Sequence, residues 1–260
     1  MRKYLLTFKL GIINTLNYRG NMLAGFCVYS MFILVFFCLW RAIYASGDIG
    51  GLSLTQIMWY LCITEIVSFG ANTRVYGLVA QDVKSGDIAY QLLRPYGYVG
   101  YRFASSMGPA VINTVMFGLL GSALGFITVG AIPGYRLWTL IPGGIMLMLG
   151  ISIYFFAQMA IGLLAFFVEE PSGFNLLLSK GIMMFGTFMP IEILPGWLKN
   201  IVVNLPFSYV SWAPARILVG FEWELFTRAI AMQIIYLLAF IALCAALMRA
   251  GRKSIQANGG

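Results

Sequence analysis

The side chains that could carry chemistry are few and widely spaced in this chain. It has no histidine, which removes the commonest metal ligand and the commonest general base. The nine acidic residues are scattered mostly through the polar segments, so no pair of carboxylates is placed for acid–base catalysis. All four cysteines lie in apolar runs, where they behave as small hydrophobes. We therefore expect no catalytic residue, no bound cofactor and no metal in this chain.

One carboxylate lies deep inside an apolar stretch. Glu65 falls near the middle of a predicted membrane span, where an ionisable group is costly and a functional role is the default hypothesis. A polar edge runs beside it on one helix face, formed by Tyr60, Thr64, Ser68 and Asn72. We expect this edge to face the bundle interior or a partner chain. Two roles remain open for Glu65: a contact on a substrate path, or structural or gating use that pairs it with Arg41 or a hydroxyl; the second is favoured.

The segment 81–95, QDVKSGDIAYQLLRP, contains a short apolar helix between polar flanks. Asp87 is predicted to cap this helix after Gly86, and Pro95 to end it, because the residue before a proline avoids helical angles. Ile88 and Leu92 share one face at i and i+4, with Tyr90 and Leu93 beside them. Apolar residues in a polar segment predict either a protein partner or packing on the chain's own helices, and the pattern leaves both open.

The elements that position these residues follow from the composition. Apolar residues make up 60% of the chain and charged residues only 10%, against roughly 25% charged in soluble domains. Such a chain needs lipid around it, so we predict an all-α membrane protein. The net charge of +8 is attributed to basic residues that face the cytoplasm and anionic lipid, and not to nucleic-acid binding.

Hydropathy predicts a single membrane domain over residues 1–260 with six transmembrane helices. The predicted spans are 21–44, 52–72, 103–129, 137–168, 173–189 and 225–248, of which the fifth is short. Residues 1–19 are predicted to form an interfacial amphipathic helix, with Leu5, Phe8, Ile12 and Leu16 on one face.

Particular side chains within these spans predict contacts between helices. Gly121 and Gly125 form a G-x-x-x-G that can allow close helix approach. Gln158 and Gln233 are predicted to hydrogen-bond between helices.

The segment 190–224 is too apolar for a solvated loop and too broken to cross. Prolines at 190, 195, 206 and 214 divide it into pieces of about ten residues. We predict an outer re-entrant hairpin of two short helices, 196–204 and 209–219. The alternative is an ordinary outer loop with interfacial tryptophans at 197, 212 and 223.

The placement of lysine and arginine predicts the orientation. With the N terminus inside, twelve of the 17 basic residues fall on cytoplasmic segments and five on or near the outer side. An even number of spans then puts both termini in the cytoplasm.

The order of these elements is similar to that of permease subunits of the ABC-2 transporter family, over nearly the whole chain. Five residues fit that family's G-x-[IL]-x-x-x-L-L-x-P motif after the second span: Gly86, Ile88, Leu92, Leu93 and Pro95. The run TFMPIEILPGWL at 187–198 resembles its outer re-entrant region. The segment SGDIAYQLLRP is most similar to a bacterial branch of these permeases, which implies the inner membrane of a prokaryote.

This resemblance implies an ATP-driven exporter in which residues 87–94 form a coupling helix on a separate ATPase. The chain has no G-x-x-x-x-G-K-[ST] loop, so ATP and magnesium are expected on that partner. The resemblance implies two copies of the ATPase. It also implies a second permease, which is more often an unlike chain than a copy of this one. The expected contact residues are Gly86, Asp87, Ile88, Tyr90, Gln91, Leu92, Leu93, Arg94 and Pro95. Residues expected at the outer gate are Pro190, Glu192, Pro195 and Trp197, and the polar edge of Glu65 is expected on the translocation path or its gate.

Two other classes of protein are weighed against this one. A secondary transporter or channel would need no ATPase and would show internal repeats, which we do not find between the two halves. A membrane-embedded enzyme would need clustered acids, histidines or a serine–lysine pair at one depth. The transported substrate does not follow from the sequence.

Overall fold

The computed structural model of the chain is helical throughout its regular parts. No strand occurs in the part of the chain that it describes, which confirms the all-α class. The backbone is described for residues 2–17, 19–47, 51–71, 74–132, 134–188 and 190–258, and side chains for the same ranges without residues 19 and 254–258.

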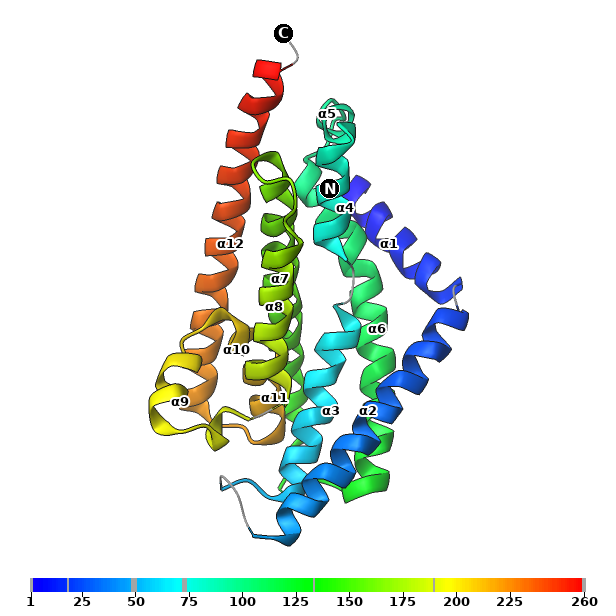
Figure 1. Cartoon of the computed structure of the whole chain (residues 1–260). Coiled ribbons are helices and arrows are strands. Elements are labelled where there is room, and N and C mark those ends of the chain that lie inside the picture. Colours follow the sequence, from blue (N-terminus) through cyan, green and yellow to red (C-terminus); the bar gives the residue numbers. More distant parts are fainter. Residues whose placement is uncertain are drawn as a thin grey trace.

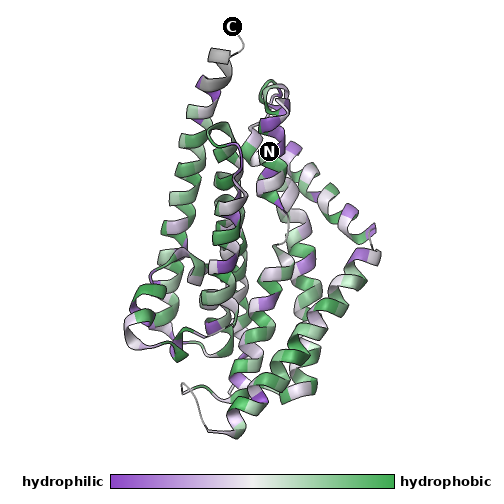
Figure 2. Ribbon diagram, in the orientation of Figure 1, coloured by the Kyte–Doolittle hydropathy of each residue, from purple (hydrophilic) through white to green (hydrophobic). Residues whose placement is uncertain are grey.

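Five helical rods in the described residues are long and apolar enough to cross a membrane. They are Gly20–Ala45, Leu54–Lys84, Tyr98–Val129, Leu137–Phe166 and Trp223–Lys253. Figure 2 shows hydrophobic residues along these rods and hydrophilic ones gathered around α4 and α5 at one end. The chain is therefore a multi-pass membrane protein, and five of the six predicted spans have a counterpart.

The first two helices meet at a sharp elbow. Helix α1 (Arg2–Asn17) lies obliquely against α6, and α2 (Arg19–Ala45) then runs to the opposite end of the bundle (Figure 1). Phe8 and Ile12 are half-buried, whereas Leu5 and Leu16 are exposed, so the predicted apolar face only partly packs on α6. The location of α1 in the headgroup region stays a prediction.

The second crossing is built from two helices. Helix α3 (Leu54–Gly70) starts with a capping box, in which the Ser53 hydroxyl accepts from the Gln56 amide and the Gln56 side chain accepts from the Ser53 amide. Helix α4 (Val75–Lys84) follows Arg74, whose φ of 45° is left-handed and strained for a non-glycine residue. Gln158 of α7 accepts a hydrogen bond from the orphan Val75 N–H at 2.9 Å, as its interhelical role predicts.

Helix α4 lies outside the predicted spans 52–72 and 103–129, yet it packs within the bundle. Val79 and Ala80 are buried against α7, so the interval outside the bundle begins only after Lys84. The two helices come close at Gly162, where an added Cβ would lie 2.6 Å from the Val79 Cβ.

Three long helices complete the core. They are α6 (Tyr98–Val129), α7 (Leu140–Leu163, extended by 3₁₀ turns at Leu137–Thr139 and Leu164–Phe166) and α12 (Trp223–Asn258). The α6 glycines work as predicted, since Gly121 receives the Tyr29 side chain of α2 and Gly125 the Trp59 ring of α3. Gln233 of α12 donates to the Met146 and Tyr209 carbonyls at 2.9 and 2.8 Å, a confirmed interhelical contact.

The fifth predicted span corresponds to a short composite helix. Helix α8 (Ser172–Ile182) continues into a π-helical segment, η3 (Met183–Phe188); Met189 lies outside the described residues. These eleven and six residues extend about 26 Å at 1.5 Å per residue, short of a ~30 Å hydrocarbon core. The sixth crossing stays a prediction.

Three short helices follow after a 3₁₀ turn, η4 (Ile191–Ile193). They are α9 (Gly196–Val202), α10 (Pro206–Val210) and α11 (Trp212–Val219). The predicted second helix therefore starts earlier, at the N1 proline, and is divided at Ser211. All three lie within the length of the bundle and not beyond its end (Figure 1), and α11 is buried against α3 and α7.

An aromatic cluster marks the end of the bundle opposite α5. Trp138 and Phe221 make an edge-to-face contact with 4.5 Å between ring centroids, and Trp223 and Phe226 extend the cluster. Trp138 and Trp223 are exposed, as is typical of side chains at a membrane–water interface.

Candidate functional site

Helix α5 (Asp87–Leu92) stands at the end of the bundle where α1 begins and α12 ends (Figure 1). Gly86 is its N-cap, with a φ of 79° that suits glycine. Asp87 is the first helical residue and accepts a hydrogen bond from the Ser85 hydroxyl at 2.8 Å, so the prediction that Asp87 is the cap was wrong. The helix ends at Leu92, two residues before the predicted end at Arg94.

The structure divides the apolar residues of α5 into two groups. Ile88 is 1% exposed and Leu92 packs on the core, so the face they share turns into the protein. Tyr90 and Leu93 are 73% and 84% exposed and point away from it. The packing alternative therefore holds for Ile88 and Leu92. The surface open to a partner, here called the α5 tip, consists of the exposed residues Gly86, Asp87, Tyr90, Leu93, Arg94 and Pro95, with Gln91 half-buried at its side.

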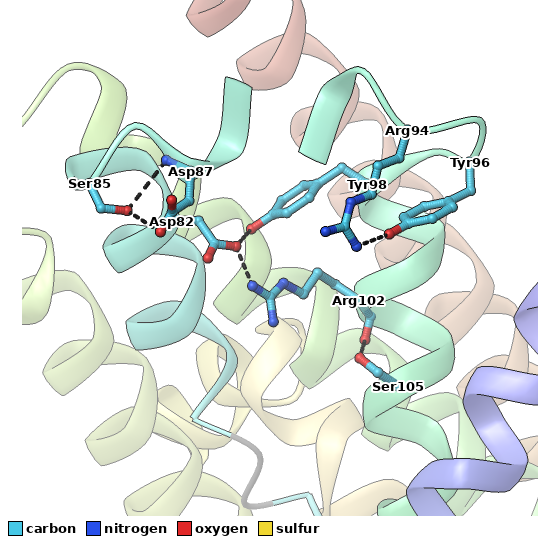
Figure 3. Close-up of polar contacts among 8 residues, drawn as sticks. All are labelled: Asp82, Ser85, Asp87, Arg94, Tyr96, Tyr98, Arg102 and Ser105. Atoms are coloured by element: carbon cyan, nitrogen blue, oxygen red, sulfur yellow. Dashed lines mark hydrogen bonds and ion pairs between the residues drawn. The ribbon is translucent and has the colours of Figure 1, made fainter. Parts of the chain in front are cut away.

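A polar network holds the two helices that flank α5. Asp82 of α4 accepts hydrogen bonds from the Tyr98 hydroxyl and the Arg102 guanidinium, both on α6 (Figure 3). The Arg102 guanidinium also lies 5.5 Å from the centroid of the Tyr98 ring. The Arg102 and Asp82 side chains are only 17% and 13% exposed. This Asp82–Arg102 network fixes the spacing of the two chain segments from which α5 projects.

A second ion pair joins α4 to the loop before α8. The Lys84 ammonium lies 3.1 Å from a Glu170 carboxylate oxygen, and the Ser172 amide donates to the other oxygen at 3.3 Å. The hydrogen bond from Lys84, followed by those from Ser172, lowers the pKa of Glu170 below its ordinary value. The pair is exposed, so it orients the loop more than it stabilises the fold.

Tyr60 and Thr64 of the polar edge of α3 are buried in the bundle interior, whereas Ser68 is exposed. Tyr60 donates a hydrogen bond to the Gly186 carbonyl of η3 at 2.7 Å, and the Thr64 hydroxyl bonds to its own helix at Leu61. Glu65 is 5% exposed and Ser68 lies beside its carboxylate. Asn72 lies outside the described residues.

Glu65 lies at a cavity of about 260 Å³ between α3, α7, α8 and η3. The hydroxyl-bearing residues around it are Ser68, Tyr154, Ser179 and Thr187. The predicted pairing of Glu65 with Arg41 is not found among the described residues; Arg41 instead lies 6.0 Å from the centroid of the Phe37 ring. Ser68 is the hydroxyl beside Glu65, and the pairing of the two stays a prediction.

One of the residues predicted at the outer gate, Glu192, pairs with a half-buried arginine, Arg216. Glu192 accepts hydrogen bonds from Arg216 at 3.0 Å and from the Trp212 indole at 3.3 Å. Arg216 also pairs with Glu222 at 3.0 Å. Pro190 and Pro195 bound the 3₁₀ turn that carries Glu192, and Trp197 is exposed on α9.

Sequence reasoning missed Arg216 and the Asp82–Arg102 network. The available signals were Trp212 and Arg216 at i and i+4, and likewise Tyr98 and Arg102, each pair aligned on one helix face.

A family model described as "ABC-2 family transporter protein" matches residues 8–259. A search of the curated proteins found no match.

Proposed function

The chain belongs to the ABC-2 transporter family, and from that premise we propose that it is the permease subunit of an ATP-driven exporter. Members of this family are membrane components of transporters that work together with an ATPase partner, and they are normally not catalytic themselves. The chain carries no phosphate-binding loop, so ATP and magnesium belong to separate ATPase subunits, two per complex. We further propose the inner membrane of a prokaryote, with α5 and both termini in the cytoplasm.

The observation that carries this proposal is the α5 tip. Tyr90 and Leu93 are large apolar side chains that stand exposed among polar neighbours at the hydrophilic end of the molecule. A surface of this kind fits a groove on another protein. The buried face of α5, formed by Ile88 and Leu92, fastens the helix to the bundle, so that a displacement of the tip moves α4 and α6 with it.

The mechanism proposed is alternating access driven from the cytoplasmic side. ATP binding draws the two ATPases together, and the α5 tip moves with the ATPase that holds it. The Asp82–Arg102 network transmits this movement to α4 and α6. The path opens outward between this permease and a second, unlike one, with the Glu192–Arg216 region as outer gate. Helix α2 has an exposed apolar face, with Leu23, Met31 and Val35 along it, that is available for such pairing.

The substitution Leu93→Asp tests the proposal. A carboxylate at the centre of the α5 tip would be desolvated on docking without a partner charge, which costs several kcal/mol of binding free energy. We expect the variant to insert normally but to lose the ATPase in co-purification, with transport-coupled ATP turnover reduced at least about tenfold.

The matched control is Phe167→Asp, which places the same charge on another exposed apolar residue in the loop between α7 and α8. This control should retain the ATPase. Normal co-purification and normal turnover of Leu93→Asp would show that α5 is not the coupling element. Transport that proceeds without any ATPase would favour a secondary transporter instead.

A further inference from the structure

The cavity beside Glu65 has an unusual combination of charge and depth. Its carboxylate lies near the middle of the rod formed by α3 and α4, and the residue is 5% exposed. No lysine or arginine is among the residues that line the cavity, and Glu65 forms no ion pair within the described residues. A carboxylate at this depth is costly unless a positive group or hydrogen-bond donors accompany it.

Hydroxyl groups from three other helices surround the same cavity. Tyr154, Ser179 and Thr187 come from α7, α8 and η3. The Thr187 residue is 1% exposed, and its hydroxyl has no hydrogen-bond partner among the residues described. Buried hydroxyls are nearly always hydrogen-bonded, so an unpartnered one at a cavity wall indicates an absent ligand or water.

The remaining residues that line the cavity are aromatic or apolar, which suits an organic cation. Phe32 and Phe188 present aromatic rings to the cavity, and aromatic faces attract ammonium groups. Ile182, Met183 and Val210 add apolar surface. The cavity volume of about 260 Å³ is many times the roughly 10–15 Å³ that one water molecule needs on the same measure, so the cavity has room for an organic cation. Ser68 is exposed, which leaves the cavity open at the side of α3.

We propose that this cavity binds a protonated amine, with the ammonium on the Glu65 carboxylate, its N–H groups donating to the Thr187 and Ser179 hydroxyls, and its carbon body against Phe32 and Phe188. That the amine is the polar head of the transported molecule rests on the proposed function. The binding itself does not, because it needs only this chain.

The test uses the full chain in nanodiscs of zwitterionic phosphatidylcholine, without any ATPase. Benzylammonium is the probe, and benzyl alcohol is its uncharged counterpart of the same shape. Saturation-transfer NMR titrations should show saturable binding of benzylammonium and no comparable binding of benzyl alcohol. Glu65→Gln should weaken benzylammonium binding by about tenfold or more, because it removes a charge-assisted hydrogen bond of the order of 1.4 kcal/mol.

Two further variants make the result specific to the cavity. Thr187→Val keeps the side-chain shape and removes the hydroxyl, and should weaken the amine by a few fold. Glu224→Gln removes an exposed carboxylate at the start of α12 and should leave binding unchanged. Equal binding of the amine and the alcohol, or undiminished amine binding by Glu65→Gln, would overturn the proposal. A failed Leu93→Asp test would overturn the role of α5 as the coupling element and would leave this result untouched, because no ATPase is present in this titration.

Discussion

The Asp82 carboxylate accepts hydrogen bonds from two α6 side chains of very different character. Tyr98 brings a neutral hydroxyl and Arg102 a full positive charge. Both the acid and the arginine are largely withdrawn from water. Removal of the arginine would leave a partly buried charge with one neutral donor, whereas removal of the hydroxyl leaves the ion pair in place.

We therefore expect Arg102→Met to lower the free energy of unfolding by about 2–3 kcal/mol, below the value for a fully buried pair because the site is not fully dry. Tyr98→Phe should cost about 1 kcal/mol. The control is Arg94→Met, which removes an exposed arginine bonded only to Tyr96 and should stay within about 0.5 kcal/mol of the parent. Denaturant unfolding in mixed micelles measures all three, and equal losses for Arg102→Met and Arg94→Met would contradict the role of the network.

Only part of the Glu65 site could be predicted from the sequence. The polar edge of α3 follows from helical spacing alone, so Tyr60, Thr64, Glu65 and Ser68 were predictable as neighbours. Tyr154, Ser179 and Thr187 were not, because their meeting with Glu65 depends on how three distant helices rotate and pack. The spacing within α5 likewise identified an apolar face but not its direction, which packing decides by burying Ile88.

Helix α7 carries one glycine that a neighbouring helix needs and another that faces open space. Gly162 lets α4 approach so closely that an added Cβ would meet the Tyr76 carbonyl at 2.8 Å as well as Val79. Gly144, on the same helix, has no atom within 4 Å of the corresponding position. Two identical substitutions on α7 thus fall in opposite environments.

Gly162→Ala should destabilise the protein by about 1–3 kcal/mol, because backbone atoms of α4 cannot yield as a flexible side chain can. Gly144→Ala should be neutral or stabilising by up to about 1 kcal/mol through reduced freedom of the unfolded chain. Thermal unfolding of both variants, followed by the accessibility of buried Cys62 and Cys244 to a thiol reagent, checks the difference. The same melting temperature for both would refute the close contact of α4 and α7.

Hydropathy predicted five of the long helices well because each spans an apolar window. It did not identify α4, because this helix carries several polar residues, although Val75, Val79 and Ala80 are buried. It also placed the start of α6 at Phe103, whereas the helix begins at Tyr98 because Tyr98 and Arg102 are held by Asp82 on α4. Tertiary contacts of this kind extend helices beyond the part that hydropathy identifies.

At the scale of the whole molecule, α5 and the aromatic cluster around Trp138 lie at opposite ends. In a background without the four native cysteines, Trp197→Cys on exposed α9 should react with a membrane-impermeant maleimide in intact spheroplasts. Ser85→Cys, exposed next to α5, should react only after permeabilisation. Labelling from the outside at position 85 would invert the proposed orientation, and labelling of both sites from one side would rule out an odd number of crossings between them.

The left-handed conformation of Arg74 interrupts the rod formed by α3 and α4, so the two helices are joined at a hinge. Helix α4 leads into α5, and its first residue, Val75, donates a hydrogen bond to Gln158 of α7. Helix α3 lies on the other side of Arg74 and carries Glu65. In an unbroken helix, the full displacement of the α5 tip would be passed on to Glu65. Under the proposed mechanism, movement of the α5 tip reaches Glu65 only through the junction of α3 and α4, where Arg74 is left-handed and Val75 is bonded to α7. We therefore expect substitutions at position 74 to change how far Glu65 moves.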